Sequence, residues 1–533
     1  MEMLKAENLS FRYGGADSLC LKHISFTIQK GEFVLLFGET GSGKSTLLKQ
    51  WKPSISPAGE RKGELFFQHK RIESLEPREE AAGIGYVSQN PDNQIVTDKV
   101  WHELAFTLEN LGLPTDEIRK RVAEIAVFFG ITGWFHKSVQ ELSGGQKQIL
   151  NLAAVMISRP ALLLLDEPTS QLDPVAAENF MNLLHRIHTE MGTTVLLAEH
   201  RLEEAYTKAD RCMVLKDGDL ICLNKTDKTA EYLYHQKISG KGQAFELLPL
   251  QVRLPAMVKQ NFSIRTICQA IRFVEENLSG GVRSADKVPA SQGETILSFQ
   301  NVWFRYEKNG MDVLRDFTLS IGKGDFLAIV GANGQGKSTL LQLAVRILKP
   351  YRGKIKRKDN VLVSLLPQNP QALFLKNTVK EELMSITEEI DSVVKRLHLE
   401  DMLEKHPYDL SGGQQQMAAL AKVLLTKPDI LLLDEPTKGI DQIKKKELGQ
   451  LLKELNQEGV TIVLVSHDVD FCAAYAKQSG MIFDGVVTSI GDVHSFFLEQ
   501  YFFTTTCLKI CRNRYKGMIT EQEVFECEQV EMG

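Results

Sequence analysis

The sequence predicts an α/β fold that occurs twice along a chain of 533 residues. Three observations lead to this prediction. Several short blocks of the first half return in the same order in the second half. In each half an apolar stretch runs into a glycine-rich turn that opens a helix. A further apolar stretch in each half ends in two adjacent acids, and such apolar runs are typical of parallel strands covered on both faces.

The composition is typical of a folded protein with more than one domain. A chain of 533 residues is too long for a single hydrophobic core. Hydrophobic residues at 43% and charged residues at 25% exclude general disorder, and a formal charge of -5 gives no general attraction to nucleic acid. We expect no signal peptide and no membrane-spanning segment, because the chain begins without a basic and apolar leader and no apolar run is long enough.

The eight cysteines are scattered, which fits a reducing compartment rather than a disulfide scaffold. Cys507 and Cys511 could indicate a metal site, but no second cysteine pair follows them. We therefore interpret both as small, partly buried residues of a tail.

Five blocks recur in order, which indicates a tandem duplication. The paired blocks are ENLSFRYGG with QNVWFRYEK, GETGSGKSTLL with GANGQGKSTLL, YVSQNP with LLPQNP, LLLLDEPTSQLD with ILLLDEPTKGID, and VLLAEH with IVLVSH. The spacing on both sides of LLPQNP is shorter than around YVSQNP, so we expect smaller insertions in the second copy. Residues 225–294 have no counterpart, and we interpret them as the last elements of the first copy followed by a connector.

The glycine-rich block of each copy has the GxxxxGK[ST] pattern of a phosphate-binding loop between a strand and a helix. Gly41 and Gly43 allow a tight turn whose N–H groups point at phosphate oxygens. Lys44 supplies a charge for the β- and γ-phosphates, and Ser45 offers its hydroxyl to Mg²⁺. The residues expected to bind ATP here are Gly38, Gly41, Gly43, Lys44, Ser45 and Thr46, and in the second copy Gly331, Gly334, Gly336, Lys337, Ser338 and Thr339.

Two adjacent acids follow an apolar strand in each copy. Asp166 and Asp434 stand at the strand ends, where they are placed to hold Mg²⁺. Glu167 and Glu435 then face the γ-phosphate and can orient or deprotonate a water molecule. A strand that ends in surface acids is the alternative, but two such pairs, each downstream of a phosphate loop, favour catalysis.

An amide and an imidazole also recur at matching positions. Gln89 and Gln368 have the reach to contact Mg²⁺ or the attacking water. His200 and His467 follow the next apolar strand and could hydrogen-bond the γ-phosphate. A single histidine at such a place is usually structural, so the recurrence carries this prediction.

An aromatic side chain and a helix-opening turn complete each copy. Tyr13 and Tyr306 precede the phosphate loops by the same distance and could stack on adenine, although a tyrosine that packs within a strand is the alternative. The Ser-Gly-Gly turn occurs as LSGGQKQ at 142–148 and as LSGGQQQ at 410–416. The start of a helix can hold an anion, so this turn is a candidate phosphate contact.

Together these motifs resemble the ATP-binding cassette (ABC) ATPase domain. The resemblance covers about residues 4–223 and 296–491. It implies two tandem P-loop NTPase domains of RecA-like α/β fold, each with an N-terminal antiparallel β region and a helical subdomain between the Gln block and LSGGQ. It also implies ATP and Mg²⁺ as cofactors, with Ser45, Gln89, Asp166, Ser338, Gln368 and Asp434 as the residues around the metal. The expected regions are a first ABC domain over 1–235, a connector over 236–294, a second ABC domain over 295–495 and a tail over 496–533.

In that family two cassettes pack head to tail, which explains why one chain carries LSGGQ twice. The implied partners are Ser143 and Gly145 with the ATP of Lys337, and Ser411 and Gly413 with the ATP of Lys44. Each copy has a full set of motifs, so we predict two hydrolytic sites. The second copy has KGID where the first has SQLD, a departure that bears on communication between the sites more than on chemistry.

QNPDNQI and AEHRLEEA in the first copy are similar to the energy-coupling-factor importers of cobalt and vitamins. This resemblance implies a peripheral protein on the cytoplasmic face of the cell membrane, a separate transmembrane subunit as partner and a substrate-binding membrane component. The implied substrate is a vitamin, with thiamine precursors such as hydroxymethylpyrimidine as one option, or a metal ion such as cobalt. The alternative is a soluble double-cassette ATPase that acts on ribosomes, but residues 225–294 lack the long charged helix typical of such factors.

Overall fold

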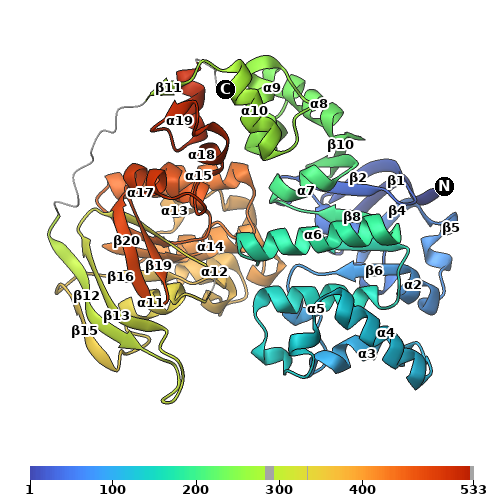
Figure 1. Ribbon diagram of the computed structural model, residues 1–533, viewed down its shortest axis with the longest axis horizontal. Coiled ribbons are helices and arrows are strands. Elements are labelled where there is room, and N and C mark those ends of the chain that lie inside the picture. The colour runs from blue at the N-terminus through green and yellow to red at the C-terminus, as the bar shows by residue number, and fades with distance from the viewer. Residues whose placement is uncertain (283–292, 333, 529–533) are drawn as a thin grey trace. The chain divides into compact units, whose positions relative to one another are not determined.

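The computed structural model describes residues 1–282, 293–332 and 334–528. The chain divides into two compact units, Met1–Thr266 and Ile267–Gly533, and each has the α/β fold predicted from the sequence (Figure 1). Parts of two predicted regions, residues 283–292 of the connector and residues 529–533 of the tail, lie outside the described residues.

The first unit contains a six-stranded sheet of order β10-β9-β3-β8-β7-β6 and a four-stranded antiparallel sheet of order β2-β1-β4-β5. The strands are β1 (Glu2–Tyr13), β2 (Leu21–Gln29), β3 (Phe33–Gly38), β4 (Gly59–Phe67), β5 (Lys70–Arg71), β6 (Ile84–Val87), β7 (Leu162–Asp166), β8 (Thr194–Ala198), β9 (Arg211–Lys216) and β10 (Asp219–Lys225). All residues of β3, β7 and β8 are buried, as expected for parallel strands with both faces covered. Because these three strands are parallel neighbours, their carboxyl ends meet at one edge of the sheet.

The helices of the first unit cover the sheet and form a separate helical subdomain. They are α1 (Lys44–Gln50), α2 (Pro77–Gly83), α3 (Val100–Asn110), α4 (Thr115–Phe128), α5 (Gly144–Met156), α6 (Pro174–Met191), α7 (Leu202–Lys208), α8 (Thr226–Ile238) and α9 (Leu250–Lys259). Helices α3, α4 and α5 pack on one another, and Figure 1 shows them as one group. Asp173 caps α6 by accepting a hydrogen bond from the Ala176 N–H, and Pro174 occupies the first helical position.

The second unit repeats this plan with a six-stranded sheet of order β16-β17-β18-β14-β19-β20 and a three-stranded sheet of order β13-β12-β15. The strands are β12 (Thr295–Phe304), β13 (Leu314–Gly322), β14 (Phe326–Val330), β15 (Arg352–Arg357), β16 (Val363–Leu366), β17 (Ile430–Asp434), β18 (Thr461–Val465), β19 (Gln478–Phe483) and β20 (Val486–Asp492). As in the first unit, the strand that leads into the phosphate loop pairs with the strand that precedes the histidine of the last repeated block.

The helical subdomain of the second unit is smaller, as its shorter spacing predicts. The helices are α11 (Lys337–Ala344), α12 (Val379–Met384), α13 (Asp391–Arg396), α14 (Gly412–Leu424), α15 (Gln442–Gln457), α16 (Val469–Tyr475) and α17 (Val493–Glu499). Helices α12 and α13 have 6 residues each, whereas α3 has 11 and α4 has 14.

Residues from the predicted connector and the predicted tail meet in the second unit (Figure 1). The elements involved are α10 (Ile267–Asn277), β11 (Gly281–Val282), α18 (Thr506–Cys511), β21 (Tyr515–Lys516) and α19 (Glu521–Cys527). Helix α10 packs on α18, and β11 pairs in parallel with β21. Leu508 and Ile519 belong to the hydrophobic core of the second unit, and Cys507 and Cys511 are buried as free thiols.

Within the described parts of the chain, no helix combines the length and the apolar character needed to cross a membrane. Within the same parts, His, Cys, Asp and Glu side chains form no cluster of three or more that would hold a metal ion by themselves.

Candidate active site

The phosphate loop of each unit requires glycine at its last position. Gly43 has a φ of 99°, and a Cβ built on it would lie 2.8 Å from Cδ2 of Leu21 and 3.1 Å from the Cys20 carbonyl oxygen. Gly336 has a φ of 89°, and its Cβ would lie 2.9 Å from Cδ2 of Leu314. These left-handed conformations and close approaches exclude larger residues, so both helices start from the same tight turn.

The lysine that begins each helix reaches back across its loop. The Lys44 ammonium donates hydrogen bonds of 2.9 Å to the carbonyl oxygens of Gly38 and Glu39. The Lys337 ammonium does the same with the two equivalent carbonyls, at 2.8 and 2.9 Å. Both lysines are buried. A buried ammonium held at a phosphate loop is suited to a polyanionic ligand.

The first acid of each pair lies beside the serine of the phosphate loop. The Ser45 hydroxyl donates to Oδ1 of Asp166 at 2.8 Å, and the Tyr86 hydroxyl donates to Oδ2 at 3.0 Å. Burial, reinforced by the charge of Glu167, raises the pKa of Asp166. Hydroxyl and carboxylate oxygens are ligands that Mg²⁺ prefers, so this pair of side chains fits that ion.

The equivalent acid of the second unit also fits a cation. Burial raises the pKa of Asp434 to about 6, with the charge of Glu435 adding to the effect and a hydrogen bond from Ser338 opposing it. Oδ1 of Asp434 is buried and has no hydrogen-bond partner within the described residues. A buried carboxylate oxygen of this kind needs compensation, which a bound cation would provide.

The second acid of each pair has an unusual backbone. Glu167 has a φ of 47° and Glu435 a φ of 50°, a left-handed conformation that non-glycine residues seldom adopt. The N–H groups of both residues still donate to the neighbouring strand, at 2.9 Å to the carbonyls of Ala198 and Val465. The same strained conformation at the same position of both copies is typical of a functional site.

The first unit brings three of the predicted residues together. The Gln89 amide donates to Oε2 of Glu167 at 2.9 Å. Nε2 of His200 lies 2.9 Å from Oε1 of the same glutamate. The glutamate, the amide and the imidazole therefore form one contiguous group at the carboxyl edge of the sheet.

The second unit arranges its glutamate differently. Nδ1 of His467 lies 2.8 Å from Oε2 of Glu435, and the His467 N–H and the Ser466 hydroxyl donate to the same oxygen at 3.3 and 3.2 Å. Although burial opposes ionisation, the hydrogen bond and charge of His467 hold the pKa of Glu435 below its usual value. Gln368 is exposed, and among the described residues no hydrogen bond joins it to Glu435 as one joins Gln89 to Glu167.

The two tyrosines lie beside the helices that follow the phosphate loops. The hydroxyl of Tyr13 is hydrogen-bonded to Oγ1 of Thr46 at 2.8 Å, and that of Tyr306 to Oγ1 of Thr339 at 2.9 Å. Tyr13 is 40% exposed and Tyr306 is 62% exposed, so a large part of each side chain is accessible to a ligand.

The repeated Ser-Gly-Gly turns are helix N-termini. Ser143 caps α5 by accepting a hydrogen bond from the Gln146 N–H at 3.3 Å, and Ser411 caps α14 through the Gln414 N–H at 3.4 Å. In both helices the glutamine reaches back to the serine N–H, which completes a capping box. Each serine hydroxyl accepts in this arrangement and keeps its own proton for donation to an anion. The next predicted contacts, Gly145 and Gly413, lie within the first turn of these helices.

Sequence reasoning missed two polar residues at the first site. Tyr86 donates to Asp166, and Glu199 accepts a hydrogen bond from the His200 N–H at 3.1 Å. Both belong to blocks that recur, YVSQNP and VLLAEH, but neither residue has the same type in the second copy. The sequence could have indicated Glu199, because it is an acid that directly follows an apolar strand and directly precedes the histidine.

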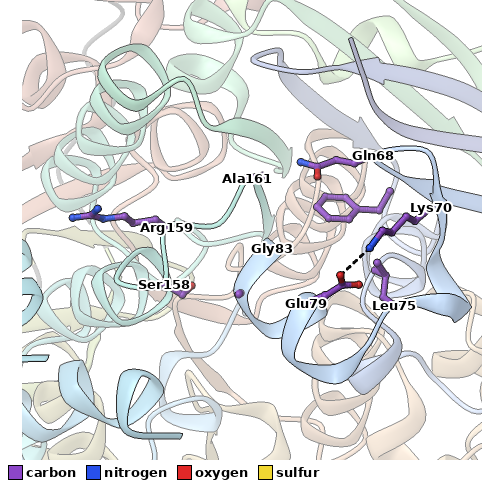
Figure 2. Close-up of a pocket in the computed structure, with 10 residues that line it drawn as sticks. Gln68, Lys70, Leu75, Glu79, Gly83, Ser158, Arg159 and Ala161 are labelled. Atoms are coloured by element: carbon purple, nitrogen blue, oxygen red, sulfur yellow. Dashed lines mark hydrogen bonds and ion pairs between the residues drawn. The ribbon is translucent and has the colours of Figure 1, made fainter. Parts of the chain in front are cut away.

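A shallow pocket of about 460 Å³ lies elsewhere in the first unit (Figure 2). Gly83 and Ala161, which line it, directly precede β6 and β7. The pocket is therefore at the amino ends of these strands, opposite the edge where the candidate site lies. Figure 2 shows the Lys70 ammonium paired with the Glu79 carboxylate. The distance between Nζ and Oε1 is 2.8 Å, and none of the predicted site residues lines this pocket.

Comparison with known proteins agrees with this geometry. A family model described as "ABC transporter" matches residues 21–170 and 314–438. A Bacillus thuringiensis protein named "Putative ABC transporter ATP-binding protein" is 40% identical over 97% of this chain and 97% of its own length. A Bacillus subtilis protein named "Putative HMP/thiamine import ATP-binding protein" is 31% identical over 98% of this chain and 97% of its own length.

One solved structure is similar over most of the chain. It is an archaeal ribosome recycling factor in complex with an archaeal ribosomal stalk protein, and it covers 92% of this chain and 90% of its own. The TM-score is 0.59 and the sequence identity is 21%. At this identity the similarity bears on the fold alone.

Proposed function

Because this chain belongs to the ABC transporter family and is therefore an ATPase, we propose that it is the ATP-hydrolysing subunit of an importer whose membrane-spanning part is a separate protein. The observation that carries the proposal is the similarity to a thiamine-import ATP-binding protein over 98% of this chain, which includes both cassettes. The NPDNQ and AEHRLEE stretches of the first cassette give independent support.

The described contacts support a role for each residue of the first site. Lys44 and the loop N–H groups bind the β- and γ-phosphates of ATP. Glu167 orients the attacking water and accepts its proton, while Gln89 and His200, each within 2.9 Å of its carboxylate, fix the direction of that carboxylate. Tyr13 stacks its exposed ring on the adenine.

Mg²⁺ completes the proposed site. Ser45, Gln89 and Asp166 would hold it in the first cassette, and Ser338, Gln368 and Asp434 in the second. When bound, the ion supplies positive charge to the β- and γ-phosphate oxygens. The protein side chains then need only position the nucleotide and exclude competing water.

We further propose that the ATP site of each cassette is completed by the LSGGQ segment, or signature, of the other cassette. The duplication of LSGGQ within one chain supports this, since each serine hydroxyl and helix N-terminus can hold a γ-phosphate. Linking the two cassettes keeps them at an effective concentration of about a millimolar. Hydrolysis cleaves the γ-phosphate that bridges them from ADP, and its negative charge leaves the site when the free phosphate is released, which gives a clamp that ATP closes and hydrolysis opens.

The Gln blocks are the proposed docking sites for the membrane subunit, at the cytoplasmic face of the membrane. Val96 is 68% exposed and Trp101 is 43% exposed just after the NPDNQ stretch, and Leu375 is 86% exposed after NPQAL in the second cassette. Exposed apolar side chains suit contact with a partner protein, and in the first cassette they follow Gln89, which contacts the hydrolytic glutamate and could transmit force from it. A substrate-binding membrane component would select the cargo, for which thiamine or its pyrimidine precursor is the proposed class.

Uptake measurements on a strain that lacks this gene test the proposal. We expect wild-type protein to restore uptake of labelled thiamine precursor and the double variant Lys44→Ala/Lys337→Ala to fail, although both accumulate equally. Purification from membranes in mild detergent should yield an integral membrane protein with this chain. Copurification of ribosomes without any membrane protein would overturn the importer and favour the ribosomal alternative.

A further inference from the structure

The residue before the histidine differs between the two cassettes. Glu199 precedes His200, whereas Ser466 precedes His467. Glu199 follows β8 directly and is 1% exposed, so an entire carboxylate is buried at the first site. Burial raises the pKa of Glu199, which shows that the ionised side chain is costly at this place.

The buried carboxylate of Glu199 joins two loops through hydrogen bonds. Oε1 of Glu199 accepts hydrogen bonds from the N–H and the hydroxyl of Thr169, at 2.9 and 2.7 Å. Oε2 accepts from the His200 N–H at 3.1 Å. Thr169 lies in the loop that joins Glu167 to Asp173, the N-cap of α6. One side chain therefore ties the segment after the hydrolytic glutamate to the segment that carries the histidine.

A second contact joins the same two segments. The Arg201 guanidinium donates to the Leu172 carbonyl at 2.9 Å. Glu199 and Arg201, on either side of His200, thus both reach into residues 169–172. The residues on both sides of His200 are therefore fixed by hydrogen bonds. Nε2 of the His200 ring lies 2.9 Å from Oε1 of Glu167.

The second site has no equivalent of this arrangement among the described residues. There the histidine N–H donates to the hydrolytic glutamate itself, and so does the Ser466 hydroxyl. The residue equivalent to Arg201 is Asp468, which turns away to pair with Lys445 at 2.6 Å. Glu435 therefore accepts the hydrogen bond that Glu199 accepts at the first site.

We propose that Glu199 is a positioning residue specific to the first site, which takes up the histidine N–H so that Glu167 is oriented by Gln89 and the His200 ring instead. The two sites then differ in how their hydrolytic glutamates are aligned, although both carry the same motifs. This inference rests on the proposed roles of Glu167 and His200. Misplacement of a catalytic group by about 1 Å can lower a rate by about 100-fold, so a positioning residue can matter as much as this.

The test measures kcat and KM for ATP with the full-length chain. Glu199→Gln keeps an acceptor for Thr169 but places an amide N–H₂ against the His200 N–H. In the Glu435→Gln background, where the first site alone retains its glutamate, we expect Glu199→Gln to lower kcat about tenfold or more with KM within about twofold. If that background is inactive, the sites are coupled, and Glu199→Gln in the otherwise wild-type chain should lower total kcat by about the same factor.

Two further variants separate positioning from loss of folding. Thr169→Val conserves shape and removes one of the three hydrogen bonds, so kcat should fall in the same direction by a smaller factor while the Tm stays close to wild type. Glu80→Gln is the matched control, because Glu80 is also buried and its Oε1 accepts hydrogen bonds from the N–H and the hydroxyl of Ser54, at 3.2 and 2.5 Å, away from the candidate site; its kcat should stay within about twofold of the parent. A kcat within about twofold of the parent for both Glu199→Gln and Thr169→Val would overturn the inference.

The double variant Glu167→Gln/Glu435→Gln tells this failure from failure of the proposed function. If the double variant is inactive while Glu199→Gln is unaffected, only the role of Glu199 is wrong. If the double variant still hydrolyses ATP at the wild-type rate, the proposed roles of the two glutamates are wrong as well.

Discussion

Some residues at the candidate site are buried although burial disfavours their charged form. Asp434 is 5% exposed, and its pKa is raised to about 6 because burial disfavours its charge. A raised carboxyl pKa means that the folded protein loses stability as the pH rises from the ordinary aspartate pKa of about 4 through 6. A buried carboxylate that destabilises the protein by itself fits the proposed role of Asp434 as a ligand of a cation.

Replacement of this carboxylate should therefore stabilise the protein in the absence of nucleotide and Mg²⁺. At pH 7.5 we expect Asp434→Asn to unfold with a free energy about 2–3 kcal/mol higher than wild type, since one pKa unit corresponds to about 1.4 kcal/mol. Near pH 4 wild-type Asp434 is protonated, and the difference should vanish. Denaturant unfolding followed by circular dichroism at both pH values measures it. Equal stability of the two proteins at pH 7.5 would show that the buried charge of Asp434 does not destabilise the folded protein.

The residues proposed to carry the chemistry could be predicted from the sequence because they stand in contiguous motifs. Lys44, Asp166 and Glu167 follow directly from GxxxxGK[ST] and from an apolar strand that ends in two acids. Tyr86 and Glu199 could not be assigned in this way, because their roles depend on contacts between segments far apart in the sequence. For the same reason the sequence did not predict that Gln89 reaches its glutamate while Gln368 is exposed.

Helices and strands around the site are held by groups that the motifs do not include. Asp468 caps α16 by accepting from the Phe471 N–H at 3.1 Å, and it pairs with Lys445 of α15 at 2.6 Å. Although burial opposes its ionisation, Lys445 and the helix N–H lower the pKa of Asp468 to about 2. A lowered carboxyl pKa stabilises the fold above a pH of about 4, and this stability is lost as the pH falls toward 2.

Loss of this charge should weaken the junction of α15 and α16. We expect Asp468→Asn to lower the free energy of unfolding by about 2 kcal/mol at pH 7. The difference should be smaller at pH 3, because Asp468 of the unfolded chain, with an ordinary pKa of about 4, is then mostly protonated while the folded carboxylate is still mostly ionised. Urea unfolding at the two pH values is the measurement. Asp484→Asn is the matched control: Asp484 pairs with Arg315 at 2.8 Å but is 61% exposed, so its loss should cost less than about 1 kcal/mol.

The order of elements was predictable where hydrophobic periodicity and motif spacing specify it. The two α/β copies and the smaller helical subdomain of the second are examples. The pairing of β11 with β21 was not predictable, because strands of 2 residues leave no sequence pattern and their partners are far apart along the chain. The assembly of α10 with α18 depends on the same long-range contact.

At the scale of the whole molecule, the central question is which signature completes which site. Both phosphate loops and both LSGGQ turns lie in one chain. The sequence alone therefore allows each LSGGQ turn to act on the phosphate loop of its own cassette or on that of the other. The capping geometry offers a selective probe. Aspartate caps a helix as well as serine does, so Ser143→Asp and Ser411→Asp should leave α5 and α14 folded. The added negative charge would nevertheless repel a γ-phosphate placed at the helix N-terminus.

If the signature of each cassette acts on the ATP of the other cassette, each variant must lower hydrolysis at the site of the other copy. In the Glu435→Gln background, where hydrolysis depends on Lys44, we expect Ser411→Asp to lower the rate about 100-fold and Ser143→Asp to lower it by less than about threefold. In the Glu167→Gln background the two effects should be exchanged. Ser143→Asn and Ser411→Asn retain the cap without the charge and should show smaller losses in the same pattern. Dependence of each site on the signature of its own cassette would contradict the head-to-tail arrangement, and the duplication of LSGGQ would then need another explanation.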